Sequence, residues 1–529
     1  MKKQPWGFYG RKEELAQLRS ILQRKRWFFL KVAGRRRIGK TSLVQEARAF
    51  DDKRPLVYIQ IPDSDPSGVL STAREFYDMF GIKKFDLKDL RSFAASIGTL
   101  IEEGNIVAID EFQYFHRQAL SEFASHLQYE VDRIARRADK VKGGLIVLGS
   151  IHTEMAALLE DRGAPLFNRI TDEMELPHLD IASIMEILRT HADTEPERLL
   201  FLWNLFEGIP KFYRDCYEQD TVAATRRELL KKMFFTSSSP LRNEAENWFL
   251  RELHGRYDLV LKYVAAHPGS SHSDLMAHLL TTGSGSDKQI AGYIKVLRDR
   301  YRMIERLQPI FAKEKERNGR FYVRDNFLRS WLAALSVPVA STNFKPLDPL
   351  VEEADRRLAE AEGHGLERLA HTLYEERSRK AVGDFSLTKN ISGYWDKAGT
   401  EIDLIALNED DKVIRFGSCK RDAGKLIGGL SLFDGHIERF LERKQGEFGS
   451  WKKEKVAISP RLDAGHRKAI ERKDVGALDG ELTVHVRHGG RLLPHYPVRS
   501  FVRRFAIVVG RTAGQGQDQS KTAQPSPPR

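Results

Sequence analysis

The stretch Gly34-Arg35-Arg36-Arg37-Ile38-Gly39-Lys40-Thr41 decides the fold of the first part of the chain. It fits the phosphate-binding pattern G-x-x-x-x-G-K-[ST]. Residues 27–32 before it predict a buried strand, and residues 42–47 after it predict the start of a helix. A glycine loop between a strand and a helix turns backbone N–H groups and the positive end of the helix toward a phosphate. The sequence therefore predicts a nucleoside triphosphate site at this loop, called the P-loop below.

The residues of the P-loop have distinct expected roles. Gly34 and Gly39 allow the backbone to curl tightly. Lys40 is expected to reach the β- and γ-phosphates, and the hydroxyl of Thr41 is expected to bind Mg²⁺. ATP is the predicted nucleotide, and Mg²⁺ is the predicted metal. The predicted ATP-binding residues are Gly34, Arg35, Arg36, Arg37, Ile38, Gly39, Lys40, Thr41 and Ser42.

Two adjacent carboxylates follow a second buried strand. Residues 106–109 are apolar and lead directly into Asp110 and Glu111, and residues 55–61 predict a further strand. Strands that alternate with helix-length segments predict a parallel α/β sheet, which binds ligands at the carboxyl ends of its strands. We therefore expect Asp110 to hold Mg²⁺, and Glu111 to orient and deprotonate the attacking water as a general base.

Two further polar residues have two interpretations each. Ser150 ends a strand predicted over 144–150, and its hydroxyl either bonds the γ-phosphate or the water, or caps the next helix. Arg169 follows a proline turn. It either stabilises charge on the γ-phosphate, in its own subunit or in a neighbour, or is a surface arginine. The predicted catalytic residues are Glu111, Lys40, Arg169 and Ser150.

Several short motifs follow one another in a fixed order. They are residues 10–15, the arginine-rich P-loop, and residues 109–113, 149–150, 165–169 and 208–211. As a set they resemble the prokaryotic P-loop ATPases often called archaeal-type ATPases, which are related to AAA+ and STAND NTPases. The resemblance covers about residues 5–235. It implies a winged helix after the ATPase and a restriction-endonuclease-like domain at the C-terminus.

The length of 529 residues predicts several domains. The expected fold class is α/β, with a parallel-sheet P-loop NTPase domain followed by a winged helix-turn-helix and an α/β restriction-endonuclease-like domain. The expected divisions are an ATPase core at 1–175, a helical lid at 176–245, a winged helix at 246–336, a linker at 337–349, the restriction-endonuclease-like domain at 350–511 and a disordered tail at 512–529.

Residues 250–335 predict three helices followed by a β-hairpin with an Asn318-Gly319 turn. The third helix, about residues 287–301, has an apolar face and an opposite basic face. This pattern predicts a winged helix whose third helix enters a DNA major groove and whose hairpin tip touches phosphates. The alternative is a winged helix that contacts proteins or relays the nucleotide state. The DNA-contact candidates are Lys288, Lys295, Arg298 and Arg302.

Two predicted strands near the C-terminus resemble the PD-(D/E)xK nuclease core. That resemblance implies a metal site in which Asp403 is the metal ligand, Lys420 activates water and Glu367 is the helix acid. Ser418 stands where that core has an acidic ligand. Because Mg²⁺ usually needs one or two carboxylates, we expect a domain that no longer cuts. Glu401, two residues from Asp403 on the same strand face, is a candidate substitute for the missing acid.

The charge balance has the sign expected for contact with nucleic acid. The chain has 86 Lys and Arg against 74 Asp and Glu, which gives a net charge of +12. Residues 482–517 contain arginines and no acidic residue, so they predict a basic C-terminal edge that either contacts DNA phosphates or only keeps the surface soluble. The cysteines Cys216 and Cys419 do not form a disulfide or zinc pattern. No signal peptide or long apolar run is present, so we expect no membrane contact and a cytoplasmic protein.

Three functional hypotheses follow from these patterns. The leading hypothesis is an ATP-hydrolysing, DNA-associated switch in which the nucleotide state controls the winged helix and the C-terminal domain. The second is an ATP-regulated DNA endonuclease of a defence or mobile element. The third is a STAND-like signalling scaffold that binds only proteins. A protein partner and a homo-oligomer stay open under all three hypotheses.

Overall fold

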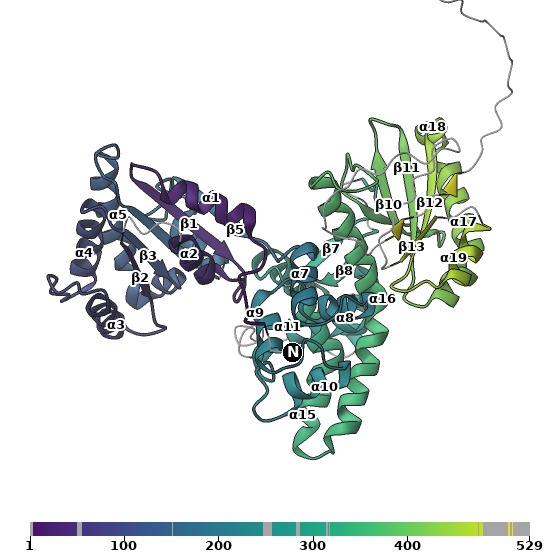
Figure 1. The fold of residues 1–529 in the computed structure, drawn as a ribbon, viewed down its shortest axis with the longest axis horizontal. Coiled ribbons are helices and arrows are strands. Elements are labelled where there is room, and N and C mark those ends of the chain that lie inside the picture. Colours follow the sequence, from purple (N-terminus) through teal and green to yellow (C-terminus); the bar gives the residue numbers. More distant parts are fainter. Residues whose placement is uncertain are drawn as a thin grey trace, which may run out of the picture. The chain divides into compact units, whose positions relative to one another are not determined.

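A computed structural model gives the structure of the protein (Figure 1). It describes residues 4–49, 55–150, 152–246, 257–281, 286–313, 316, 318–473, 476–479, 506–507 and 510–511. The chain forms two compact units: Met1–Thr194, Leu202–Glu305 and Phe321–Leu358 make the first, and Glu195–Phe201, Arg306–Arg320 and Ala359–Arg529 make the second. The predicted disordered tail lies outside the described residues, as does most of the predicted basic edge at 482–517.

A five-stranded parallel sheet forms the core of the first unit (Figure 1). Its strand order is β2-β3-β4-β1-β5. The strands are β1 (Phe28–Gly34), β2 (Leu56–Gln60), β3 (Ile106–Asp110), β4 (Gly144–Gly149) and β5 (Asp172–Leu176). The helices between and before them are α1 (Lys12–Leu22), α2 (Lys40–Arg48), α3 (Pro66–Met79), α4 (Leu90–Glu102), α5 (Glu122–Ala135) and α6 (His152–Leu159).

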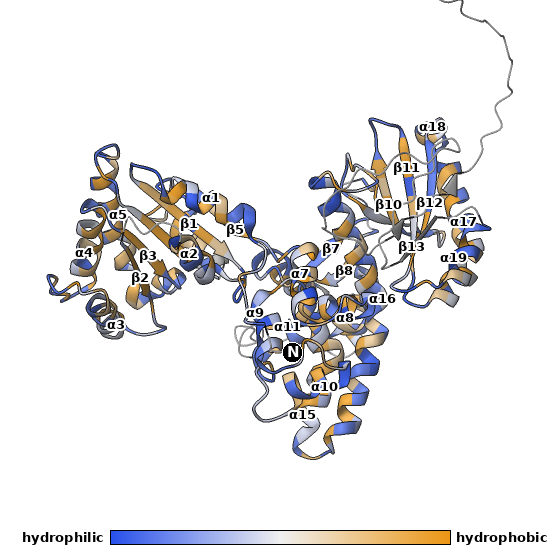
Figure 2. Ribbon diagram, viewed as in Figure 1, coloured by the Kyte–Doolittle hydropathy of each residue, from blue (hydrophilic) through white to orange (hydrophobic). Residues whose placement is uncertain are grey.

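Strands β1 to β4 are largely apolar because helices cover both faces of the sheet, whereas the edge strand β5 alternates acidic and apolar residues. Successive strand residues point to opposite faces, so the neighbours Phe28 and Phe29 enter different clusters. Phe29 packs in a cluster that includes Phe93 of α4 and Phe123 of α5. Phe28 packs in a second cluster with Leu18 of α1 and Leu43 of α2. Figure 2 shows the resulting hydrophobic strands. This arrangement fits the predicted parallel-sheet domain and brings the carboxyl ends of β1 and β3 to one edge.

Helices follow the sheet in the first unit. Asp180 caps α7 by accepting a hydrogen bond from the backbone of Ser183, and Pro210 begins α9 in the position where proline is best tolerated. Helix α8 has residues in both units. These helices are α7 (Ile181–His191), α8 (Pro196–Phe206), α9 (Pro210–Glu218) and α10 (Arg226–Leu230), which continues into a π-turn at Lys231–Phe235.

Three helices and a small sheet occupy the region predicted as a winged helix. The apolar face predicted for the third helix is buried at Ile290, Ile294 and Leu297. The small sheet has the order β6-β8-β7. The elements are α11 (Tyr257–Ala266), β6 (Ser270–Ser271), α12 (His272–Thr281), α13 (Asp287–Lys295) with a π-turn at Val296–Arg300, β7 (Ile304–Leu307) and β8 (Arg320–Val323). The helices and the hairpin are present, while their use as a DNA-binding winged helix stays a prediction.

The predicted linker at 337–349 is largely helical instead. Its residues belong to α15 (Ser336–Ala340), a 3₁₀ turn at Ser341–Asn343 and the start of α16 (Leu347–Arg379). The prolines suggested an irregular linker, but both lie in helical segments. Pro349 is the third residue of α16, where a proline is tolerated because its missing N–H has no helical partner in the first turn. Pro338 lies in α15, which follows directly on the π-helical residues Trp331–Leu335. Before α15, the chain forms α14 (Asn326–Ser330) and a π-turn at Trp331–Leu335.

A mixed sheet forms the core of the second unit. Its order is β14-β13-β12-β11-β10-β9, and β15 pairs with β12. Neighbours from β9 to β11 are antiparallel, whereas β11, β12 and β13 are parallel. The elements are β9 (Ser392–Trp395), β10 (Glu401–Asn408), β11 (Val413–Cys419), α17 (Ala423–Arg443), α18 (Gln445–Phe448), β12 (Lys452–Ile458), α19 (Ala464–Glu471), β13 (Gly476–Asp479), β14 (Ala506–Ile507) and β15 (Gly510–Arg511). No helix of the described part of the chain has the length and apolar composition that crossing a bilayer requires.

The hairpin between β7 and β8 packs within the second unit. The Phe311 ring lies 5.3 Å from the Phe448 ring, centre to centre. The backbone N–H of Ile310 donates to the carbonyl of Gly393 at 2.9 Å. The indole N–H of Trp395 donates to the carbonyl of Asn318 at 2.7 Å. These described hairpin residues are therefore occupied by protein contacts. Glu314, Lys315 and Arg317, at the tip predicted to touch DNA phosphates, lie outside the described residues.

Candidate functional site

The P-loop forms a tight turn between β1 and α2. Gly39 has φ 94° and Gly34 has φ 150°, both in the region that side chains rarely adopt. A side chain at Gly34 would also meet the carbonyl oxygen of Leu176 at 3.0 Å. Helix α2 begins at Lys40, directly after the turn. The two glycines of the pattern are therefore required by the backbone itself.

Lys40 lies buried at the centre of the P-loop. Its ammonium group donates to the carbonyls of Gly34 at 3.0 Å and Arg35 at 3.2 Å. A third hydrogen bond reaches the hydroxyl of Ser150 at 3.2 Å. Burial lowers the pKa of Lys40 to about 8, although the nearby Asp110 opposes this shift. The three contacts use all three donors of the ammonium group.

Asp110 receives three hydrogen bonds at the end of β3. Its Oδ2 accepts from the hydroxyl of Thr41 and from that of Tyr58, both at 2.6 Å. Its Oδ1 accepts from the backbone N–H of Glu111 at 2.8 Å. The Thr41 hydroxyl and the Asp110 carboxylate are hard oxygen donors of the kind that Mg²⁺ prefers. The parallel sheet and this loop fit a P-loop NTPase domain.

Glu111 is held in an unusual backbone conformation beside Asp110. It has φ 55°, which costs a non-glycine residue about 1–3 kcal/mol and is typical of functional sites. Its carboxylate accepts from the side-chain amide of Gln113. The amide oxygen of Gln113 in turn accepts from the backbone N–H of Ser150 at 3.3 Å. The structure thus links the predicted catalytic residues Glu111, Ser150 and Lys40 through Gln113.

The sequence analysis assigned no role to two residues that contact the predicted site, Tyr58 and Gln113. Tyr58 lies on β2 in register with β3, where Gln60 pairs with Asp110. Burial raises the pKa of Tyr58, and the adjacent Asp110 raises it further, so its hydroxyl stays a donor. Gln113 is almost completely buried. The sequence offered one signal for Gln113, which is a polar residue within an otherwise buried segment. It offered none for Tyr58, because the contact of its hydroxyl with Asp110 depends on β2 lying next to β3 in the sheet.

Arg169 does not join this group. Its guanidinium makes two hydrogen bonds to the carboxylate of Asp132 on α5, at 2.7 Å and 3.0 Å. It also donates to the carbonyl of Phe167 at 2.9 Å. The hydrogen bond with Asp132 is the main cause of the raised pKa of Arg169. The structure therefore places Arg169 on Asp132 rather than on Lys40 or Asp110.

The other predicted ATP-binding side chains differ in their surroundings. Arg36 and Ser42 are exposed. The carbonyl of Ile38 accepts from the guanidinium of Arg11 at 3.2 Å, which ties the segment before α1 to the loop. Arg35 and Arg37 form ion pairs with Asp325 and Glu244, respectively. The loop therefore has both solvent-facing side chains and side chains engaged by other elements of the first unit.

The four DNA-contact candidates lie at and after α13. Lys288, Lys295, Arg298 and Arg302 are all exposed. The guanidinium of Arg298 pairs with the carboxylate of its neighbour Asp299, at 2.6 Å and 3.0 Å. Arg302 has φ 51° and follows the π-helical residues Val296–Arg300, just past the end predicted for the helix. The charge of Arg298 is therefore partly offset by Asp299, and all four candidates stay exposed.

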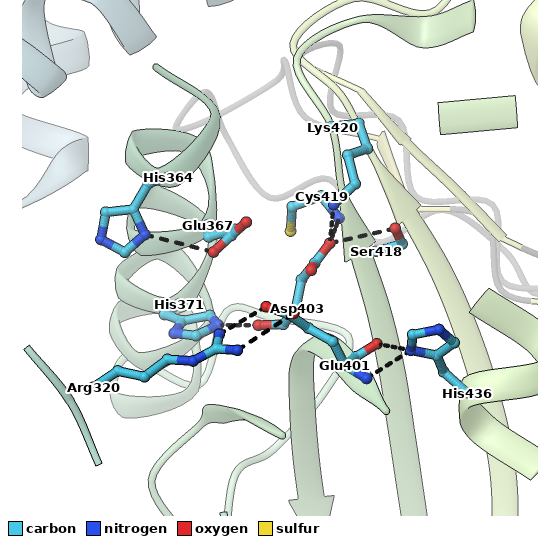
Figure 3. Close-up of polar contacts among 10 residues, drawn as sticks. All are labelled: Arg320, His364, Glu367, His371, Glu401, Asp403, Ser418, Cys419, Lys420 and His436. Atoms are coloured by element: carbon cyan, nitrogen blue, oxygen red, sulfur yellow. Dashed lines mark hydrogen bonds and ion pairs between the residues drawn. The ribbon is translucent and has the colours of Figure 1, made fainter. Parts of the chain in front are cut away.

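A second polar group lies in the second unit (Figure 3). Oδ2 of Asp403 accepts from the ammonium of Lys420 at 2.8 Å and from the backbone N–H of Cys419 at 2.7 Å. The hydroxyl of Ser418 lies 3.3 Å from the same oxygen. Burial raises the pKa of Glu367 to about 8, and the negative charge of Asp403 adds to this shift. The structure thus brings Glu367, Asp403 and Lys420 together.

Glu401 lies beside this group but is engaged elsewhere. Its carboxylate accepts from the guanidinium of Arg320 at 2.8 Å and 3.4 Å. This contact is the main cause of the lowered pKa of Glu401. Across the described residues, no three His, Cys, Asp or Glu side chains converge closely enough to hold a metal ion. In this arrangement, the position at which the PD-(D/E)xK core has an acidic ligand carries the neutral hydroxyl of Ser418 and no carboxylate.

Comparisons with known proteins give distant similarities. No protein-family model matches the chain. An uncharacterised protein of Methanocaldococcus jannaschii is 25% identical over 441 residues, which span 80% of this chain and 91% of that protein. A Walker-type ATPase of Pyrococcus abyssi is 20% identical with a TM-score of 0.44, covering 61% of this chain and 96% of that one. The ORC2 protein of Aeropyrum pernix, solved as ADPNP–ADP complexes, is 16% identical with a TM-score of 0.43, covering 68% and 98%. The functional assignment therefore rests on the geometry of the P-loop.

Proposed function

We propose that this protein binds ATP with Mg²⁺ at the P-loop and hydrolyses it. The observation that carries the proposal is the meeting of Lys40, Thr41 and Asp110 at one edge of the parallel sheet. The hydroxyl oxygen of Thr41 lies 2.6 Å from Oδ2 of Asp110. A buried lysine and two hard oxygen donors form a site that suits a phosphate and a divalent cation.

The residues of the site divide the chemistry among them. Lys40 and the backbone N–H groups of the loop bind the phosphates. Thr41 and Asp110 hold Mg²⁺, which neutralises developing negative charge when bound. Glu111 accepts the proton of the attacking water, and Gln113 orients the Glu111 carboxylate through its amide. The hydroxyl of Ser150 accepts a hydrogen bond from Lys40, as two carbonyls of the loop do, and it supplies a further hydrogen-bonding group.

We further propose that the ATPase is a DNA-associated switch. The exposed lysines Lys288 and Lys295 on α13 support contact with phosphates. The net charge of +12 has the same sign. ATP turnover with and without duplex DNA, at two salt concentrations, tests this proposal. Stimulation that fades with added salt supports it, whereas turnover indifferent to DNA, with no DNA binding, favours the protein-binding scaffold.

An ATP-regulated endonuclease is the second candidate function. The grouping of Glu367, Asp403 and Lys420 favours it. Against it stands Ser418, which supplies a neutral hydroxyl in place of a carboxylate ligand. We therefore propose that the C-terminal domain binds DNA or a partner without cutting. Mg²⁺-dependent cleavage by the wild type that Asp403→Ala abolishes would replace this proposal with the endonuclease.

A further inference from the structure

Two arginine side chains of the P-loop are held by carboxylates from later parts of the first unit. Nε of Arg35 lies 2.5 Å from Oδ2 of Asp325, and Nη2 of Arg37 lies 2.8 Å from Oε2 of Glu244. The two carboxylate side chains are 12% and 7% exposed, so neither pair is an exposed surface contact. The Arg35 guanidinium also lies 5.6 Å from the centre of the Phe212 ring. The loop is thus tied to two separate later segments.

Asp325 uses its two oxygens for different partners. Oδ2 binds Arg35, whereas Oδ1 accepts from the backbone N–H of Leu328 at 2.8 Å and caps the first turn of α14. A capping carboxylate stabilises a helix start. The same side chain therefore connects the P-loop to the helix that opens the segment from Asn326 to Ala340.

Helix α14 is itself anchored in the first unit. The side-chain amide of Asn326 donates to the carbonyl of Trp203 at 3.0 Å. The hydroxyl of Ser330 donates to the carbonyl of Asn204 at 3.0 Å. The ring of Phe327 lies 4.7 Å from that of Phe212, the residue that Arg35 also contacts. Any displacement of α14 must therefore break or rearrange these hydrogen bonds and this ring contact.

The other end of the connection is the carbonyl of Arg35. That carbonyl accepts from Lys40, whose three N–H donors are all used by Gly34, Arg35 and Ser150. An ammonium group has only three donors, so Lys40 must give up at least one of these bonds to bind a phosphate. Arg35 is thus the residue at which the phosphate-binding lysine and the cap of α14 meet.

We propose that the Arg35–Asp325 ion pair couples nucleotide binding at the P-loop to the conformation of α14 and the residues that follow it. The Arg37–Glu244 ion pair is a second connection between the P-loop and a later segment. The proposal rests on the ATP-binding function proposed above. In this proposal, the bond that Lys40 gives up to bind a phosphate is the one to the carbonyl of Arg35. The loop backbone then adjusts, and the ion pair between Arg35 and Asp325 weakens. Coupling between two sites is reciprocal, so loss of the pair must also change the affinity of the loop for nucleotide.

The test uses hydrogen–deuterium exchange of the full-length protein with a non-hydrolysable ATP analogue and Mg²⁺. In the wild type, we expect the nucleotide to change the exchange of the backbone amides of residues 326–335. In Asp325→Asn, which still caps α14, we expect this change to be lost and the nucleotide to bind at least about fivefold more tightly. The matched control is Asp172→Asn, which breaks the 2.6 Å Arg24–Asp172 pair away from the P-loop residues and should leave both readouts at wild-type values.

The outcomes separate this proposal from the proposed function. A wild type that does not bind the analogue contradicts ATP binding itself. Normal binding with no nucleotide-dependent exchange in residues 326–335 overturns only the coupling. Normal binding with the same exchange difference in Asp325→Asn overturns the role of the pair. Thermal unfolding shows whether Asp325→Asn is folded. If it is not, Asp325→Glu, which keeps the negative charge, takes its place and has to retain the wild-type exchange difference; loss of that difference in a folded Asp325→Glu overturns the role of the pair.

Discussion

The hydroxyl of Thr41 lies 2.6 Å from the carboxylate of Asp110, although the two residues are 69 positions apart in the sequence. Thr41 stands in the first turn of α2 and Asp110 ends β3. Because β4 lies between β1 and β3 in the sheet, the contact depends on the strand order as well as on both motifs. The pair therefore joins two local patterns into one site that is suited to a divalent cation.

The affinity for nucleotide should fall as the pH rises through about 8. Burial lowers the pKa of Lys40 to about 8, so the charged ammonium that attracts phosphate is lost above that pH. Between pH 7 and pH 9 we expect a decrease of about tenfold, since only the charged form binds well. Titration with a fluorescent ATP analogue measures this decrease. Lys40→Arg stays charged in this range and is the control. An equal pH dependence in Lys40→Arg would assign the decrease to another group.

Glu111→Gln should retain nucleotide binding and lose turnover. The amide keeps the size of the side chain but cannot accept a proton from water. General bases contribute about 10²–10⁴-fold, so we expect a decrease of this order in kcat. Steady-state phosphate release and nucleotide titration on the same preparation separate the two effects. Wild-type turnover in Glu111→Gln would refute the assignment of Glu111 as the base.

Arg415 should stabilise the second unit strongly. Its buried guanidinium pairs with Asp384 and with Glu454, each at 2.8 Å. Removing one partner of a buried ion pair leaves uncompensated charge and costs about 3–5 kcal/mol. We therefore expect Arg415→Ala to lower the free energy of unfolding by about this amount in chemical denaturation. Lys389→Ala removes an exposed pair with Glu409 and should cost no more than about 1 kcal/mol. Equal effects of the two variants would contradict the account of the buried network.

Ser418→Glu should restore an acidic ligand beside Asp403. The Ser418 hydroxyl already lies 3.3 Å from Oδ2 of Asp403, so a carboxylate at this position faces the same group. If the domain is a nuclease that lost one ligand, the variant gains Mg²⁺-dependent cleavage of duplex DNA that the wild type lacks. A gel-based cleavage assay with and without Mg²⁺ measures this gain. The double variant with Asp403→Ala is the control, and cleavage that persists in it would point to a contaminant or another site.

The sequence predicted the parts of the site that depend on local spacing. The two glycines, Lys40 and Thr41 are fixed relative to one another by the turn into α2, and Asp110 follows from a buried strand that ends in a carboxylate. The partners of Arg35 and Arg169 were not predictable, because Asp325 and Asp132 come from distant segments whose placement depends on packing. The helical segments within 337–349 were missed for a different reason. A proline in the first turn of a helix, such as Pro349, has the same sequence pattern as a proline in a loop.

The most direct test of the central claim is the rate of phosphate release from ATP by the full-length protein, with and without Mg²⁺, for the wild type and Lys40→Ala. We predict Mg²⁺-dependent turnover by the wild type and a decrease of at least about 100-fold in the variant, as for the loss of a group that stabilises developing charge. Lys84→Ala, which removes an exposed ion pair with Glu103, should match the wild type. Equal rates in the wild type and Lys40→Ala, or no turnover by the wild type, would contradict an ATPase site at the P-loop.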